Sequence, residues 1–348
     1  MGARLARLTV NPDAIAANWR WFARAAGKAD CAGVVKADAY GLGADAAAAA
    51  LLSAGCRSFF VATAVEGARV RDVVGAAPNI YVLNGAAPDE VRLLQQEELM
   101  PVLNSLAQIA LWGDAGPAAL HIDTGMNRLG ISPDDVVEAG LLLPKPKLVM
   151  SHLACASTRG HEMNARQRAA FVTASHAFPG AKLSLAASAG AQLGEDYLFD
   201  MIRPGIGLYG WAGMDDGNPP LAAATTITAP VLQMRDVPAG ESFGYGATKR
   251  ADKPMRAATV ALGYADGFLR SFTGSGYGVS GGARLPLLGR VSMDLVILDA
   301  TAAPDLKAGD EVEFLGEGAP IEEVARAAGT LPYEILTTFA GTVRKNQA

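Results

Sequence analysis

The sequence is poor in cysteine, which excludes several classes of protein at the outset. Only three cysteines occur in 348 residues, Cys31, Cys56 and Cys155, and no two of them form a CxxC pair. This argues against a disulfide framework and against the usual zinc spacings, and it predicts a reducing compartment. We therefore expect a cytoplasmic protein without a metal site.

Long apolar runs and basic runs are also missing. The longest apolar stretch, at 44–52, contains Asp45 and is too short to cross a bilayer. The first residues, MGARLARLTVNPDAI, lack the apolar core of a signal peptide. The net charge is −5 and no stripe of arginine or lysine occurs, so we expect neither a membrane nor a nucleic acid as partner.

Apolar residues make up 50% of the chain, and their pattern over the first two thirds predicts a barrel. Continuous apolar runs separated by stretches of helical spacing are typical of a parallel sheet covered on its faces. Eight such units favour an α/β fold with a closed (β/α)8 barrel, and an open doubly wound sheet is the alternative. The expected strands are 31–36, 58–62, 79–83, 100–103, 119–123, 147–152, 182–185 and 199–203.

The pattern changes after Gly210, where WAGMDDGNPP forms a turn-rich link. Beyond it, β-branched or alternating runs predict a mostly β domain with one closing helix at 321–328. We expect two domains, residues 1–222 and residues 223–348, and the first strand, 5–10, is a candidate to pair with the second domain. The expected strands of that domain are 225–233, 257–262, 284–288, 291–299 and 311–315.

Lys36 ends one of the buried runs and is followed by ADAYGLG. In a barrel, functional groups gather where strands end and loops begin. A lysine at the dry end of a strand can have a lowered pKa, which suits covalent bonding to a carbonyl compound. The ordinary alternative is a lysine that reaches out from the strand end into solvent.

Several other expected strands end in polar residues that would share a rim with Lys36. Taken singly, each has an ordinary explanation as a core, surface or turn residue; taken together with the lysine, they predict an active site. Gly205 and Gly207 offer backbone N–H groups that suit a phosphate. The polar residues are His121, Asp123, Arg128, His152, Ser188 and Arg203.

Tyr245 lies between two glycines in the second domain, within ESFGYGATKRA. Glycines on both sides free the backbone for a tight approach. An exposed loop tyrosine without a function is the ordinary alternative.

Eight motifs give the chain a specific resemblance. VVKADAYGLG at 34–43 resembles the pyridoxal-phosphate lysine motif of the alanine racemases, which are fold-type III enzymes. DTGMNRLG, SHLACAS, RPGIGLYG, GYGAT, VALGYADG, GRVSMD and YEILT follow in family order and cover essentially the whole chain. The resemblance implies a barrel followed by a β domain, and a cytoplasmic isomerase that interconverts L- and D-alanine for cell-wall peptidoglycan or for alanine breakdown.

The resemblance also implies two catalytic residues. Lys36 would carry pyridoxal 5'-phosphate covalently and act as one base. Tyr245 would be the second base and would come from the partner subunit of a head-to-tail homodimer. Two bases on opposite faces of Cα can remove a proton on one side and return one on the other. A free tyrosine has a pKa of about 10, so Tyr245 needs neighbouring positive charge.

Further roles follow for the cofactor and the substrate. Arg203 would face the pyridine nitrogen, with His152 hydrogen-bonded behind it. Arg128 and the backbone of Met293 would bind the substrate carboxylate. The phosphate would be held by Tyr40, Ser188, Gly205 and Ile206. The substrate entrance would be lined by Tyr264 and Asp294.

Three departures from the family pattern affect these roles. His121 stands where many members have a lysine, which leaves open what orients Arg128. Ala187 stands where many members have asparagine, so one polar contact near the cofactor is lost. Gly341 lies near the place of a C-terminal tyrosine that contacts the phosphate in some members. We expect weaker cofactor binding, with Tyr40 carrying more of the phosphate contact.

Three alternatives remain at the level of sequence. A racemase of broader specificity, acting on serine as well, would differ only in the shape of its pocket. A barrel decarboxylase with the same cofactor would place an acid where this chain has Arg203. A non-catalytic cofactor-binding protein would have no use for a second domain that carries Tyr245.

Overall fold

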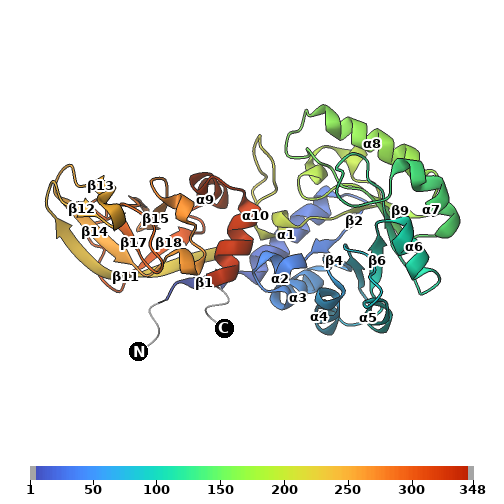
Figure 1. Cartoon of the computed structure of the whole chain (residues 1–348), viewed down its shortest axis with the longest axis horizontal. Helices are drawn as coiled ribbons and strands as arrows, with labels where there is room; N and C mark the ends of the chain where they lie inside the picture. Colours follow the sequence, from blue (N-terminus) through green and yellow to red (C-terminus); the bar gives the residue numbers. More distant parts are fainter. Residues whose placement is uncertain (1–4, 344–348) are drawn as a thin grey trace. The chain divides into compact units, whose positions relative to one another are not determined.

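The computed structural model describes residues 5–343, which form two compact units (Figure 1). One unit contains residues 12–39 and 43–222. The other contains the described part of the N-terminus up to Asn11, the short segment Tyr40–Leu42, and residues from Ala223 onward. Each unit has its own core, so each is described by itself.

The larger unit is a barrel of parallel strands. Seven strands pair in chain order, from β3 to β9. The strands β2 (Asp30–Cys31) and β3 (Gly33–Val34) are two parts of one extended segment, interrupted at Ala32. The others are β4 (Ser58–Val61), β5 (Asn79–Val82), β6 (Met100–Leu103), β7 (Ala119–His121), β8 (Leu148–Met150), β9 (Lys182–Ser184) and β10 (Met201–Ile202).

Strand β10 closes the barrel. It pairs in parallel with β2, through Met201 opposite Asp30 and Ile202 opposite Cys31. Just beyond its end, Arg203 forms a parallel bridge with Ala187, which follows β9. The eight-stranded barrel predicted from the apolar runs is therefore confirmed, and the open-sheet alternative is wrong.

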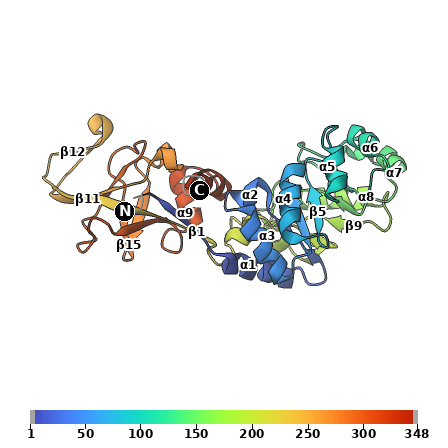
Figure 2. The same cartoon turned by 90° about the horizontal axis from the view of Figure 1, so that it is seen from below.

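Helices lie around the outside of these strands (Figures 1 and 2). Local sequence fixes their ends: the Thr63 side chain caps the start of α4, and Gly55 ends α3 in the left-handed conformation. Between β9 and β10 the chain forms no α-helix, only the short 3-10 turns η2 (Gly190–Gln192) and η3 (Glu195–Tyr197). The α-helices are α1 (Pro12–Ala25), α3 (Ala44–Ala54), α4 (Ala64–Val74), α5 (Val91–Gln96), α6 (Leu106–Trp112), α7 (Val136–Leu142) and α8 (Glu162–Ser175).

The segment α2 (Lys36–Tyr40) is a left-handed turn. Ala37, Asp38 and Ala39 have φ of 52–53° and ψ of 46–50°, and Tyr40 has φ of 60°. Side chains with a Cβ clash with the backbone in this conformation, and each such residue costs about 1–2 kcal/mol. Surrounding contacts must therefore hold this turn in place.

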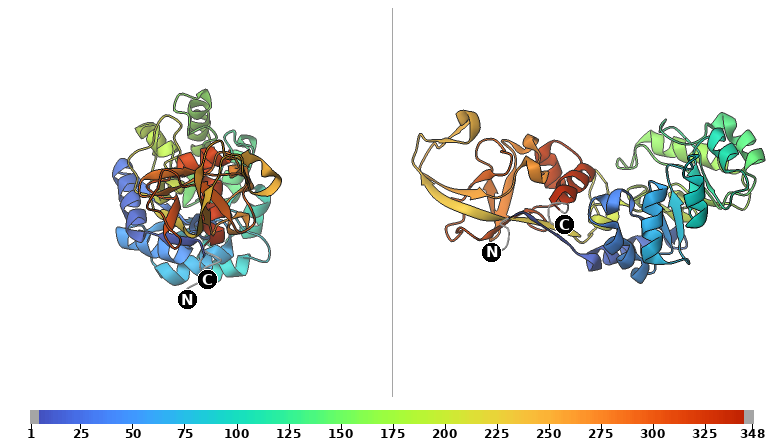
Figure 3. Two further views of the ribbon diagram at one scale, coloured as in Figure 1. Left: turned by 90° about the vertical axis from the view of Figure 1, so that its left-hand side faces the viewer. Right: turned by 60° about the horizontal axis from the view of Figure 1, so that its bottom comes forward.

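The smaller unit is built on antiparallel strands, with the long strand β11 (Thr225–Val237) running through it (Figure 3). β11 pairs with β14, with β18 and with β1 (Arg7–Val10), so the N-terminal segment joins a sheet formed by the end of the chain. The other strands are β12 (Ser242–Phe243), β13 (Lys249–Arg250), β14 (Met255–Val260), β15 (Tyr277–Ser280), β16 (Ala283–Pro286), β17 (Val296–Asp299) and β18 (Glu311–Leu315).

The C-terminal helices complete this unit. They are α9 (Ile321–Ala328), α10 (Pro332–Glu334) and the π-helical segment η8 (Ile335–Ala340). Just after η8, Gly341 lies so close to Gly41 that a Cβ on Gly41 would be 2.8 Å from the Cα of Gly341. A Cβ on Gly341 would come no nearer than 3.4 Å to Gly41, so packing requires glycine at position 41 and gives no structural reason for the departure at Gly341.

Across residues 5–343, no helix is long and apolar enough to span a bilayer. The same residues contain no cluster of three or more histidine, cysteine, aspartate or glutamate side chains placed to hold a metal ion. All three cysteines are free thiols, and Cys31 and Cys56 are buried.

Candidate functional site

The structure places the expected polar residues at the carboxyl ends of the barrel strands. Lys36 follows β3, His121 ends β7, and His152 follows β8. Ser188 lies beyond β9, and Arg203 directly follows β10. Carboxyl ends of parallel strands share one rim of a barrel, so these side chains gather around its mouth.

Lys36 contributes a side-chain amine to this rim of the barrel. Its pKa is lowered, first by burial and then by the positive charge of Arg128, while the carboxylate of Glu66 acts in the opposite direction. Burial disfavours the charged ammonium form because it removes water. A larger share of Lys36 is therefore the neutral amine, which is the form that can accept a proton or attack a carbonyl carbon.

Arg203 also lies at this rim, and its positively charged side chain is almost fully buried. Its guanidinium donates to the Ser184 hydroxyl and to the Ser151 carbonyl, the latter at 2.7 Å. Burial lowers the pKa of Arg203 to about 9, so the guanidinium is still charged at neutral pH. A fixed positive charge lies at the mouth of the barrel, held by the ends of strands β8 and β9.

His152 and His121 are neutral neighbours of this cation. Burial and the charge of Arg203 lower the pKa of His152 to about 3, and the same two causes lower the pKa of His121 to about 4. The Nδ1 atom of His152 lies 3.4 Å from Nη2 of Arg203. Because guanidinium can only donate, this Nδ1 must be the acceptor and the proton resides on Nε2.

Asn104 fixes the tautomer of His121. The Asn104 amide nitrogen donates to the carbonyls of Leu83 (3.0 Å) and Val102 (2.7 Å), so its oxygen is left to accept. That oxygen lies 2.9 Å from Nδ1 of His121. His121 is therefore protonated on Nδ1, and its Nε2 lone pair is available as an acceptor.

Arg128 lies in the loop after β7 and is exposed. It makes no hydrogen bond or ion pair within residues 5–343, although its charge acts on Lys36, His121 and His152. No side chain within residues 5–343 hydrogen-bonds Arg128, and His121 pairs with Asn104 instead.

The backbone after Arg203 forms a cradle of N–H donors. Gly205 and Gly207 both donate to the Ser188 hydroxyl oxygen, at 3.0 and 3.1 Å. A Cβ on Gly207 would lie 2.4 Å from the Phe22 ring and 3.1 Å from that oxygen, so only glycine fits. Ile206 begins the 3-10 helix η4 (Ile206–Tyr209) at this point. Converging N–H groups and a hydroxyl suit an anion such as phosphate.

Tyr40 belongs to the smaller unit. It is buried and lies beside Tyr333, with ring centroids 6.2 Å apart. Burial raises the pKa of both phenols, so both are protonated at neutral pH and can donate a hydrogen bond.

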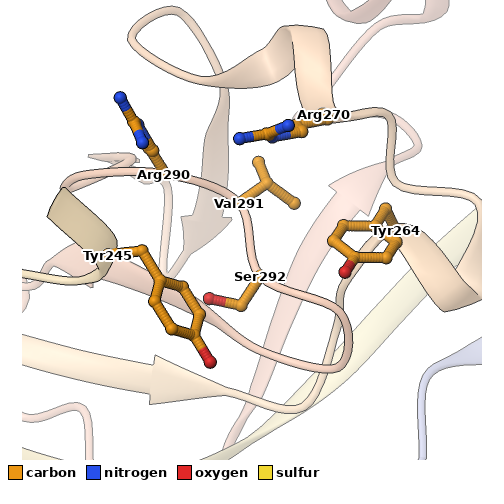
Figure 4. A pocket seen from close by; sticks show the side chains of 6 residues that line it. All are labelled: Tyr245, Tyr264, Arg270, Arg290, Val291 and Ser292. Carbon is orange, nitrogen blue, oxygen red and sulfur yellow. The ribbon is translucent and has the colours of Figure 1, made fainter.

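Tyr245 lies on the rim of a hollow of about 570 Å³ in the smaller unit (Figure 4). Its side chain is 72% exposed and belongs to the short 3-10 helix η5 (Tyr245–Ala247). Arg290 lies next to this helix, because a Cβ on Gly246 would be 3.2 Å from its Nη1. The remaining lining residues are Tyr264, Arg270, Val291 and Ser292.

Met293 and Asp294 lie on the loop before β17 and are exposed. This loop is fixed to the one that carries Tyr264. The Tyr264 amide donates to the Ser292 carbonyl (3.1 Å), and the Ala265 amide donates to the Met293 carbonyl (2.9 Å). A Cβ on Gly263 would lie only 2.1 Å from the Met293 oxygen, which leaves no room for any other residue.

The sequence did not reveal several polar residues of these sites. Asn104 follows β6 and could have been found by the strand-end rule that identified His121. Ser151 and Ser184 are equally close to strand ends, but serine is too common for the rule to select them. Arg270 and Arg290 carried no signal, because isolated arginines in loops are ordinary surface residues.

Comparisons with known proteins assign the whole chain to one family. The family model described as "Alanine racemase, N-terminal domain" matches residues 10–212, and the model described as "Alanine racemase, C-terminal domain" matches residues 224–347. The alanine racemase of Methylobacterium sp. (strain 4-46) is 46% identical over 347 residues, which are 96% of this chain and 95% of that protein. The biosynthetic and catabolic alanine racemases of Agrobacterium fabrum are 43% and 42% identical.

Solved structures of alanine racemases are also similar to this chain over almost its full length. An alanine racemase from Bartonella henselae with covalently bound pyridoxal phosphate is 37% identical and covers 97% of this chain and 98% of that chain, with a TM-score of 0.91. The biosynthetic alanine racemase of Pseudomonas aeruginosa is 35% identical, with 97% coverage of both chains and a TM-score of 0.90.

Proposed function

Because the chain belongs to the alanine racemase family, isomerases that interconvert L- and D-alanine, we propose that Lys36 and Tyr245 are its two bases. The observation that carries the proposal is the lowered pKa of Lys36 at the mouth of the barrel, which burial and the charge of Arg128 cause. A neutral amine there can take a proton from the substrate carbon. Membership of this family sets aside the decarboxylase and the non-catalytic binding protein.

The donors of the barrel rim fit pyridoxal 5'-phosphate. The N–H groups of Gly205 and Gly207 converge on the Ser188 hydroxyl, which is an arrangement that suits a phosphate, and no larger residue fits at Gly207. In this proposal, Ser188, Gly205, Ile206 and Tyr40 hold the phosphate. Arg203, with His152 behind it, would face the ring nitrogen, and its charge would disfavour protonation there. When bound, the cofactor supplies an aldehyde for the lysine and a ring that draws electrons from Cα.

The protein itself moves the protons. Nζ of Lys36 accepts or returns the proton on one face of Cα, and Oη of Tyr245 does so on the other. Arg128 and the Met293 backbone bind the substrate carboxylate and fix which bond to Cα is presented to the two bases. Tyr264 and Asp294 line the way in.

Tyr245 requires a second subunit in this proposal. We propose a head-to-tail homodimer in which Tyr245 serves the site of the partner subunit. Its 72% exposure in a single chain supports this, because a catalytic phenol must lie within a site that excludes water.

We also propose that residues 1–222 carry the cofactor and residues 223–348 contribute Tyr245, with the first strand, 5–10, paired to the latter. A cytoplasmic location is proposed as well, and the three free thiols support it.

Borohydride trapping tests the cofactor and its anchor together. The purified protein is reduced with borohydride, digested, and its peptides are weighed and sequenced by mass spectrometry. We expect the added mass of the reduced cofactor on Lys36 and on no other lysine. The variant K36A should carry no label and should not interconvert the alanine enantiomers. A label on another lysine, or full activity in K36A, would refute the proposal.

A further inference from the structure

The turn that follows Lys36 is strained and must be held by its surroundings. Ala37, Asp38 and Ala39 are all left-handed, and none of them is glycine. A run of such residues persists only where neighbouring groups over-determine the conformation. The contacts that hold it therefore also decide where the backbone of Lys36 points.

Glu66 is the side chain that holds the start of this turn. One of its carboxylate oxygens accepts the Ala37 N–H at 2.9 Å, and the other accepts the Ala62 N–H at 2.7 Å. Ala37 directly follows the lysine, and Ala62 directly follows strand β4. A single carboxylate thus ties the ends of two adjacent strands together by two charge-assisted hydrogen bonds.

Glu66 is itself fixed. It lies in the first turn of α4, where the positive end of the helix dipole favours a carboxylate. Its own N–H donates to the Thr63 hydroxyl at 3.2 Å. We call the two hydrogen bonds from the Glu66 carboxylate to the Ala37 and Ala62 N–H groups the clamp. The clamp is anchored to a helix and does not depend on a flexible loop.

The clamp acts on Lys36 through the peptide bond. The Ala37 N–H and the Lys36 carbonyl belong to one rigid plane, so fixing that N–H also fixes ψ of Lys36. The direction in which the lysine side chain leaves the backbone follows from this dihedral. The negative charge of Glu66 also raises the pKa of Lys36, against the effects of burial and of Arg128.

We propose that Glu66 is a positioning residue for Lys36, whose carboxylate clamps the Lys36–Ala37 peptide to the end of β4 and thereby aims the amine. The inference rests on Lys36 being the reactive amine of the proposed function. A role confined to capping α4 is the competing explanation, and it would leave the behaviour of Lys36 unchanged.

Hydrogen exchange at the Ala37 amide gives a readout that needs no catalysis. Ala37 is exposed, so its N–H should exchange fast unless the carboxylate protects it. In E66Q, glutamine offers one acceptor oxygen to two N–H groups, so one bond is lost. We expect slow exchange in the wild type and roughly 10- to 100-fold faster exchange in E66Q, the factor that corresponds to one bond to a charged group.

E138Q is the matched control, because Glu138 also lies in the first turn of a helix, α7, and is exposed. It should leave the Ala37 amide unchanged. The pH dependence of kcat adds a second readout. Removing the charge of Glu66 lowers the pKa of Lys36, so the limb due to this amine should move to lower pH in E66Q and stay in place in E138Q.

The outcomes separate the two proposals. Fast exchange at Ala37 in the wild type overturns the clamp, and this measurement holds even if E66Q does not fold. Equal exchange and equal pH profiles in E66Q and the wild type overturn it too. Failure of the proposed function would appear differently, as a wild-type protein that takes up no cofactor on Lys36 while Ala37 is still protected.

Discussion

His121 and His152 are uncharged at neutral pH, because burial and the nearby guanidinium of Arg203 both oppose protonation. A neutral imidazole offers one donor and one acceptor, and at His121 the amide of Asn104 decides which nitrogen is which. At the rim of this barrel, the charge state of a side chain is thus set by its neighbours and not by its type.

Stability should therefore fall in mild acid. The pKa of His121 is about 4 in the folded protein and about 6.5 in the unfolded chain. Between these two values the unfolded chain binds a proton that the folded protein does not, so the free energy of unfolding decreases as the pH falls. One such group contributes about 1.4 kcal/mol per pH unit. We expect the variant H121Q to show a flatter dependence in denaturant unfolding across this window.

The control is H176Q, which makes the same change at an exposed histidine at the end of α8. Its unfolding should depend on pH as that of the wild type does. A slope unchanged in H121Q would show that His121 is protonated alike in the folded and unfolded states.

At this scale the sequence predicted the chemistry of Lys36 better than its surroundings. Its place at the end of a buried run predicted a lowered pKa, and the structure shows that burial is the main cause. Glu66 could not be predicted, because its partner Ala37 is 29 residues away in sequence. An acid in the first turn of a helix is ordinary in sequence, and only the fold gives it two strand ends to hold.

At the scale of the element, glycines allow two loops of the smaller unit to touch. Gly263 lies against the peptide that joins Met293 to Asp294, and hydrogen bonds from Tyr264 and Ala265 hold the loops together. The loop that carries the proposed carboxylate contact is thus positioned by the loop that carries Tyr264. A change in one should displace the other.

The substitution G263A tests this coupling. Its Cβ would lie 2.1 Å from the Met293 oxygen, so the Met293 loop must move. A displacement of about 1 Å can reduce a rate roughly 100-fold, and we expect kcat/KM for alanine to fall by about 10- to 100-fold. Borohydride labelling of Lys36 should be unaffected, because the lysine belongs to the other unit.

G160A is the control, because a Cβ at that position meets no atom within 4 Å. It should keep the wild-type kinetics. Normal kinetics in G263A would mean that the Met293 backbone takes no part in binding the carboxylate.

Element boundaries show why the remainder of the fold was harder to predict. The run 291–299 reads as one strand, but only β17 (Val296–Asp299) is extended, because residues 291–295 form the loop that packs on Gly263. The strand β15 (Tyr277–Ser280) was missed among glycines at 274, 276, 278, 281 and 282. A Cβ on Gly278 would lie 2.4 Å from Val312, so this glycine is a packing requirement and not a turn signal.

At the scale of the whole molecule, the proposed site needs groups from two chains. Lys36 and Tyr245 belong to different compact units, and Tyr245 is exposed in a single chain. In a head-to-tail homodimer, each subunit would give its lysine to one site and its tyrosine to the other. Such a reciprocal exchange of residues between two identical subunits makes activity a property of the pair of chains.

Mixing two inactive variants tests this arrangement. K36A lacks the amine and Y245F lacks the phenol hydroxyl, so each alone should be inactive. After mixing and subunit exchange, a mixed dimer has one site with both groups intact and one site with neither. Random pairing makes half of the dimers mixed, so about one quarter of the wild-type activity should return, measured as D-alanine formed from L-alanine.

For the control, the K36A and Y245F homodimers are each crosslinked covalently before they are mixed. Subunits then cannot exchange, and the mixture should stay inactive. If Tyr245 instead served the lysine of its own chain, every site in a mixed dimer would lack one group. No activity would then return on mixing, although sedimentation would still show dimers. Activity thus returns on mixing only if Tyr245 of one subunit serves the site that contains Lys36 of the other subunit.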